Sequence, residues 1–181
     1  MAVESHKIYQ SMMLEIKIRI RAIDSCLKKN NGALSALDTE FCFLSSRMII
    51  EQICFSSILC DKQRYEDFRR LEGETGTKDH GNYVKDWKSP TILKKMRDIS
   101  PHFMPRPLGE RTSTNNTHHF DHGFETTHTE LINMWEKCGS FLHVPKPFGE
   151  GYESHVEKVR SKYSAASKVI ESYSQYFKDL I

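Results

Sequence analysis

Hydrophobic residues recur at steps of three and four along most of the chain, which is the pattern of amphipathic helices. The first stripe predicts a long helix from Val3 to Lys29, which the Asn-Asn-Gly run at residues 30–32 should end. Its apolar positions are Ile8, Met12, Ile16, Ile20, Ile23 and Leu27.

A second helix is predicted to begin at Ser35, which resembles a capping box with Asp38 three residues later. Its apolar face is predicted to consist of Leu37, Phe41, Leu44 and Met48. Residues 49–59 are apolar almost all round, so this helix should be the most buried element. Arg47 and Glu51 interrupt the run four residues apart, which places them on the same side.

Four further segments have clear signals. Residues 61–72 are highly charged but keep helical spacing, so the second helix continues or restarts there, before a Gly-rich loop at residues 73–81. Ser89-Pro90 begins a short helix that Pro101 should end. Thr127 and Glu130 form a capping box for a helix that ends near His143. Residues 152–180 keep a seam of steps of four and three, which predicts one long final helix.

The segment between these helices is irregular. Residues 101–126 contain three prolines and a polar run, and a small hairpin within residues 101–123 is the one place where strands are plausible. The predicted fold is therefore an all-α antiparallel bundle of four to six helices with one long irregular loop, forming a single domain over residues 1–181.

Charge gives a local hint about partners. The formal net charge is only +2, so binding to nucleic acid or anionic lipid requires a local patch. Seven Lys or Arg stand against three Asp or Glu between Val84 and Arg111, which is either such a patch or a solvated basic face. The residues predicted to contact nucleic acid are Lys94, Lys95, Arg97, Arg106 and Lys137.

Cysteine usage points to a reducing compartment. The five cysteines are odd in number, form no CxxC pair and lie mostly in apolar stretches. No secretory signal and no stretch of about 18 apolar residues is evident, so we expect a cytoplasmic protein without a membrane partner.

Three histidine-containing patterns are candidates for chemistry. His118, His119, Asp121, His122 and His128 are residue types that bind zinc, but their spacing fits no closed site, so a polar loop is the simpler interpretation and no metal or cofactor is predicted.

Arg97 and His102 stand five positions apart at a helix end. A histidine can transfer a proton while an arginine stabilises the phosphorane, as metal-free RNA cleavage requires. With the predicted helical bundle, this Arg-x4-His pattern resembles the HEPN superfamily. The resemblance implies either a metal-independent ribonuclease or an inactive member that binds RNA or a nucleotide, often in a bacterial defence or toxin system.

The segment from Lys137 to His143, followed by a Pro-Phe turn and a closing helix, resembles the same family in its setting. It departs from the motif because Lys137 replaces the expected arginine and lacks its bidentate fork. His143 is then either a helix cap or a reagent. If Glu51 reaches the end of that helix it orients His143 as a general base; otherwise it pairs with Arg47.

The predicted catalytic residues are therefore His143, Glu51, Arg47, Arg97 and His102. The leading hypothesis is a HEPN-like protein that binds RNA or a nucleotide, with ribonuclease activity as its catalytic form; no DNA-specific motif is present. The alternative is a non-catalytic interaction protein that forms a homodimer, or binds a partner helix, through its long C-terminal helix.

Overall fold

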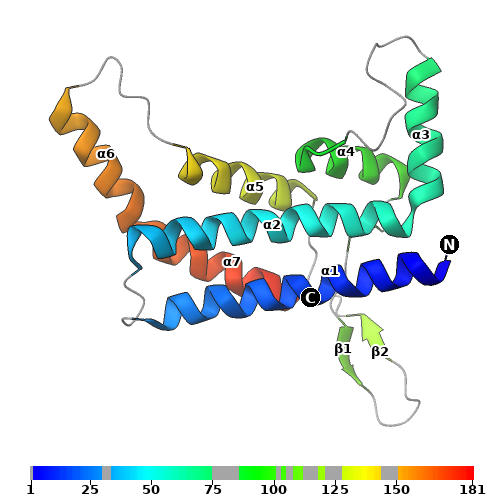
Figure 1. The fold of residues 1–181 in the computed structure, drawn as a ribbon, viewed down its shortest axis with the longest axis horizontal. Coiled ribbons are helices and arrows are strands. Elements are labelled where there is room, and N and C mark those ends of the chain that lie inside the picture. The colour runs from blue at the N-terminus through cyan, green and yellow to red at the C-terminus, as the bar shows by residue number, and fades with distance from the viewer. Residues whose placement is uncertain are drawn as a thin grey trace.

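The computed structural model describes residues 2–29, 34–74, 86–100, 103–104, 108–111, 118–120, 128–143 and 151–181. These residues form an all-α bundle with one small hairpin (Figure 1). The elements are α1 (Ala2–Lys28), α2 (Ala36–Cys60), α3 (Lys62–Glu74), α4 (Ser89–Ile99), β1 (Leu108–Arg111), β2 (His118–Phe120), α5 (His128–Leu142), α6 (Tyr152–Ser164) and α7 (Ala166–Leu180).

The helix α2 lies at the centre of the bundle. Figure 1 shows α1 on one side of it and α5 on the other, both antiparallel to α2, with α7 packed against α1 and α2. The predicted cap at its start is confirmed, because the Asp38 backbone N–H donates to Ser35 Oγ at 3.1 Å. The buried positions of α1, such as Ile16, Ile20 and Ile23, follow the predicted stripe.

The face of α2 that enters the core differs from the prediction. Leu37, Phe41 and Leu44 are 78%, 44% and 48% exposed, and the opposite side of the helix is buried instead. That side carries small hydroxyl residues among the isoleucines, and Ser57 Oγ donates to the carbonyl of Ile53 at 2.8 Å. A hydroxyl that is satisfied within its own helix can be buried at little cost.

The composition of α2 also corrects the expectation that no segment is apolar enough to span a membrane. By length and composition α2 could cross a membrane, with a mean hydropathy of 1.3 over a window of 18 residues. However, 56% of that window is buried inside the fold, and the central helix of a folded core can have the same length and composition.

The helix α2 ends at Asp61, and α3 restarts there at a steep angle to it (Figure 1). Ion pairs then hold α3 against α4: Arg69, whose side chain is 4% exposed, donates through Nη2 to Asp86 at 3.0 Å. Tyr65 donates to the same carboxylate at 2.7 Å, and Lys95 Nζ lies 2.6 Å from Glu72. This network joins α3 to α4 and to the segment before it.

The predicted long final helix is two helices. The chain breaks at Ala165, and α6 turns away from the body of the bundle while α7 runs along α1 (Figure 1). Ile170, Phe177 and Leu180 of α7 are buried in the core, whereas Tyr152 at the start of α6 is 83% exposed. The predicted seam therefore does not form one continuous surface for a partner. The restart after Asp61 was one of the two predicted alternatives, and the break at Ala165 adds one more helix, so the described part of this all-α bundle contains seven helices.

The predicted hairpin is confirmed. Strands β1 and β2 pair antiparallel, with Leu108 opposite Phe120 and Arg111 opposite His118. Residues 101–102, 105–107, 112–117 and 121–127 lie outside the described part, as does the predicted cap residue Thr127.

Candidate functional site

The predicted site residues Arg47 and Glu51 pair with each other on α2, and Trp135 joins this pair to α5. Arg47 Nε donates to Glu51 Oε1 at 3.1 Å, and the indole N–H of Trp135 donates to the same oxygen at 3.1 Å. The Arg47 guanidinium carbon lies 4.0 Å from the centroid of the Trp135 ring, within the range of a cation–π interaction. The carboxylate is thus held by two donors from two helices.

The guanidinium of Arg47 lies close to Gly139 of α5. A Cβ on Gly139 would lie 3.4 Å from Nη1 of Arg47, so the guanidinium lies directly against the backbone of α5. The neighbouring thiol of Cys138 is buried, and burial raises its pKa to about 12 despite the positive charge of Arg47. Cys138 is therefore a packing residue, because a thiol needs a low pKa to act as a nucleophile.

Of the two alternatives for Glu51, pairing with Arg47 is the one observed. The contacts of Glu51 within the described residues go to Arg47 and Trp135. His143 lies eight residues beyond Trp135 on α5, roughly 12 Å along the helix axis. Glu51 acts as a structural anchor between helices, and the structure gives His143 no carboxylate partner among the described residues.

His143 lies at the exposed end of α5. Its backbone N–H donates to the carbonyl of Gly139 at 3.1 Å, which closes the last turn of the helix. Its own carbonyl accepts a hydrogen bond from Lys162 Nζ of α6 at 3.2 Å. A cation is favoured there because the C-terminus of a helix carries partial negative charge.

Two lysines flank the last turn of α5. Lys137 Nζ lies 5.8 Å and Lys162 Nζ 5.9 Å from the centroid of the Phe141 ring. Phe141 is anchored because it stacks on Phe43 of α2, with centroids 3.9 Å apart and planes at 15°. We call Lys137, His143 and Lys162 the α5 cluster.

Within the described part of the chain, no ion pair joins a carboxylate to the α5 cluster. Within the described residues neither lysine ammonium meets a carboxylate, and the His143 ring is exposed. Lys162 was missed by sequence reasoning, because its place beside α5 depends on the direction in which α6 leaves Ala165. Lys137 was predicted.

The other predicted basic residues are dispersed. Arg97 Nε donates to Asp98 at 2.9 Å, and its Nη1 lies 3.4 Å from Nε2 of His128. Lys95 forms an ion pair with Glu72, whereas Lys94 is exposed on α4. His102 and Arg106 lie outside the described residues, so the Arg97–His102 pair is not described.

The histidine cluster at residues 118–128 is described only in part. His118 and His119 belong to β2, Asp121 and His122 lie outside the described residues, and His128 contacts Arg97. Among the side chains that the structure describes, no group of three or more His, Cys, Asp or Glu is placed to hold a metal ion.

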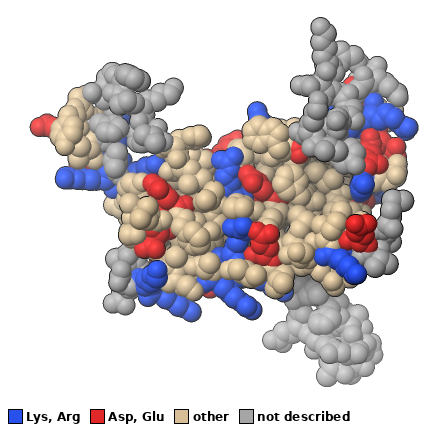
Figure 2. Space-filling view, in the orientation of Figure 1, with Lys and Arg blue, Asp and Glu red and all other residues tan. Residues whose placement is uncertain are grey.

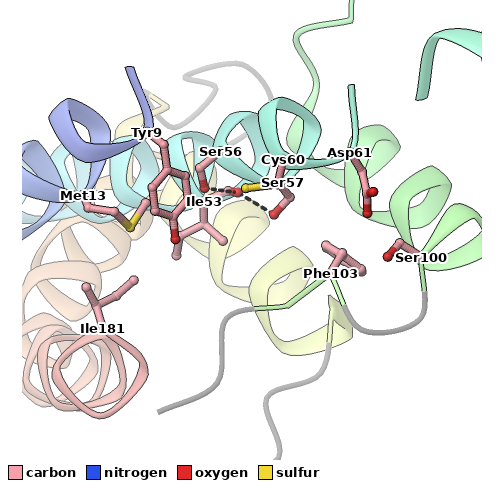
Figure 3. A pocket seen from close by; sticks show the side chains of 10 residues that line it. All are labelled: Tyr9, Met13, Ile53, Ser56, Ser57, Cys60, Asp61, Ser100, Phe103 and Ile181. Atoms are coloured by element: carbon pink, nitrogen blue, oxygen red, sulfur yellow. Dashed lines mark hydrogen bonds between the residues drawn. The ribbon is translucent and has the colours of Figure 1, made fainter. Parts of the chain in front are cut away.

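A separate pocket of about 260 Å³ lies between α1, α2, the end of α4 and the C-terminus (Figure 3). Tyr9, Met13 and Ile181 point into it, and its lining is mostly apolar. The hydroxyls of Ser56 and Ser57 both donate to the carbonyl of Ile53, so they offer little to a ligand. No predicted site residue in the described part of the chain lines this pocket.

The chain matches no protein-family model, no curated protein and no solved structure.

Proposed function

We propose that this chain binds RNA or a nucleotide by holding phosphate groups at the α5 cluster. The observation that carries the proposal is the position of Lys137 and Lys162 around a single anchored phenylalanine, each ammonium within 5.9 Å of the ring centroid. Lysine ammonium groups bind phosphate as point charges, and two of them from different helices hold neighbouring phosphates.

A catalytic form of this proposal rests on the HEPN resemblance. Cleavage by the 2′-hydroxyl requires one group to remove a proton and another to protonate the leaving oxygen. His143 supplies one such group, with Lys137 and Lys162 as the phosphate clamp. Glu51 does not supply the second, because Arg47 and Trp135 hold its carboxylate. Binding is therefore the primary proposal, and cleavage in a bacterial defence or toxin-type system is its extension.

The test of binding compares two double variants with the same change in charge. Lys137→Glu/Lys162→Glu removes the α5 cluster, and Lys7→Glu/Lys17→Glu reverses two exposed lysines of α1. Fluorescence anisotropy with a single-stranded RNA at low salt should show a loss of affinity of roughly tenfold or more for the first variant only. Equal losses in both variants would mean that net charge alone drives binding and would overturn the proposal.

The test of cleavage is separate. Purified protein and its His143→Ala variant are incubated with total RNA in EDTA, which chelates divalent metal ions and so inhibits contaminating metal-dependent nucleases. Cleavage by the parent protein and its loss in the variant support the catalytic form. If the RNA stays intact with the parent protein, the catalytic form of the proposal is wrong.

A further inference from the structure

The outer face of α2 carries an apolar stripe that no part of the described chain covers. At 100° per residue its members fall on one side of the helix, opposite the residues buried in the core. Four of them are between 37% and 78% exposed, and Met48 and Leu59 are half-buried. The outer stripe consists of Leu37, Phe41, Leu44, Met48, Phe55 and Leu59.

The outer stripe runs the length of a 25-residue helix, about 37 Å at 1.5 Å per residue. In Figure 2 the face crossed by α2 is largely tan, with charged groups gathered near its middle and at its edges. Single exposed apolar residues are ordinary, but a row of large apolar side chains along one side of a helix can mark an interaction surface.

The spacing of the outer stripe is symmetric about Met48 except at Leu44, whose mirror position holds Gln52. Phe41 and Phe55 lie seven residues to either side of it, and Leu37 and Leu59 lie eleven. If a second α2 packs antiparallel with a two-fold axis at Met48, each phenylalanine meets a phenylalanine and each terminal leucine meets a leucine. Such self-complementarity is what a two-fold interface requires.

The charges beside the outer stripe have their centre one residue from Met48, because the midpoint of Arg47 and Glu51 is residue 49. Arg47 precedes Glu51 by one turn on one edge of α2, with side chains 23% and 30% exposed. An antiparallel copy reverses this order, so Arg47 of one chain faces Glu51 of the other. Figure 2 shows two adjacent blue and red pairs near the middle of this face, both with blue on the left.

We propose that the outer stripe is the interface of a homodimer in which two α2 helices pack antiparallel about Met48. Helices in contact lie 8–10 Å apart, so the stripe buries itself against its own copy and the flanking ion pairs fix the register. The proposal does not depend on phosphate binding at the α5 cluster, because the outer stripe and that cluster have no residue in common.

The first test measures mass in solution. The full chain should have about twice its single-chain mass of 21.1 kDa by light scattering at micromolar concentration. Phe41→Glu should return it to the single-chain mass because two carboxylates would enter the interface. Ile18→Glu, at a residue 54% exposed on α1, is the matched control and should stay dimeric. Circular dichroism checks that both variants fold.

The second test measures register by crosslinking in a Cys60→Ser background, which removes the exposed native thiol. Met48→Cys should be joined to its own copy by a bismaleimide that spans about 10 Å. Leu37→Cys alone should not be crosslinked to its own copy, because the two cysteines would lie roughly 33 Å apart along the paired helices. A mixture of Leu37→Cys and Leu59→Cys chains should be crosslinked.

Two results would overturn the proposal. One is a single-chain mass at every protein concentration up to about 100 times that used for light scattering. A monomer that sediments with phospholipid vesicles would count as the same result, because the outer stripe would then face lipid. The other is a dimer that survives Phe41→Glu and in which Met48→Cys fails to crosslink.

Discussion

At the scale of single residues, the anchor formed by Arg47, Glu51 and Trp135 makes a sharp stability prediction. Replacing Glu51 by Ala leaves the indole N–H and the guanidinium without their shared acceptor, which should cost about 1–3 kcal/mol of unfolding free energy. Trp135 should also become more exposed, with a red shift in its fluorescence.

The control for this prediction is the Arg47→Met/Glu51→Met double variant, which removes both charges and should recover part of the loss. Trp87 is 62% exposed, so its own emission should not change. A Glu51→Ala protein as stable as the parent would show that the anchor contributes nothing.

The five cysteines give a second prediction at this scale. Burial raises the pKa of Cys42 and Cys54 to about 12, as it does for Cys138, and Cys26 is also buried. A thiol reagent should therefore label one cysteine per native chain, the exposed Cys60, and all five in denaturant. Mass spectrometry after brief labelling counts them, and rapid labelling of a second cysteine would contradict the packing of α2 and α5.

At the scale of elements, α1 is joined to α7 by a carboxylate whose titration can be followed. Asp24 accepts from Ser174 at 2.6 Å and lies 2.7 Å from Lys178 Nζ. Burial opposes its ionisation, but the hydrogen bonds from Lys178 and Ser174 outweigh burial, so the pKa of Asp24 is lowered.

The sign of the pH effect follows from that direction. A lowered pKa in the folded state means that the ionised Asp24 stabilises the fold above the unfolded pKa of about 3.9, and that this stabilisation is lost as pH falls through the folded pKa. Asp24→Asn should cost roughly 1 kcal/mol at pH 7. The difference in Tm between parent and variant should shrink below pH 4; a difference that is constant from pH 7 to pH 2 would be inconsistent with this contact.

Helices with one apolar face could be predicted from the sequence, whereas a helix apolar on every face could not be oriented. The stripe of α1 is flanked by charges, so its spacing identifies its buried side. In α2 the sequence pattern indicates apolar residues on both sides, and the side with the larger residues was predicted to be buried. The structure buries the side with Thr39, Ser46 and Ser57, because small residues let α1 and α7 approach closely.

The break between α6 and α7 had no signal in the sequence. Neither glycine nor proline occurs near Ala165, and the apolar spacing continues across it. The direction of α6 therefore comes from tertiary packing, which includes the bond from Tyr163 to Glu40 at 2.8 Å. This explains why Lys137 could be predicted as part of a basic site while Lys162 could not.

At the scale of the whole molecule, net charge and fold class followed from the sequence, but the arrangement of charge did not. The basic segment at residues 84–111 is the densest in sequence, yet Lys95 is paired with Glu72 and Arg97 contacts Asp98. The α5 cluster instead combines α5 with α6 across a segment outside the described residues.

The most direct test of phosphate binding at the α5 cluster is the salt dependence of RNA affinity. The logarithm of the binding constant for single-stranded RNA falls against the logarithm of salt concentration with a slope of about 0.7 per neutralised phosphate. Lys137→Glu/Lys162→Glu should lower the magnitude of this slope by about 1.4, whereas Lys7→Glu/Lys17→Glu should leave it unchanged. An identical slope for the parent protein and the Lys137→Glu/Lys162→Glu variant would contradict phosphate binding at the α5 cluster.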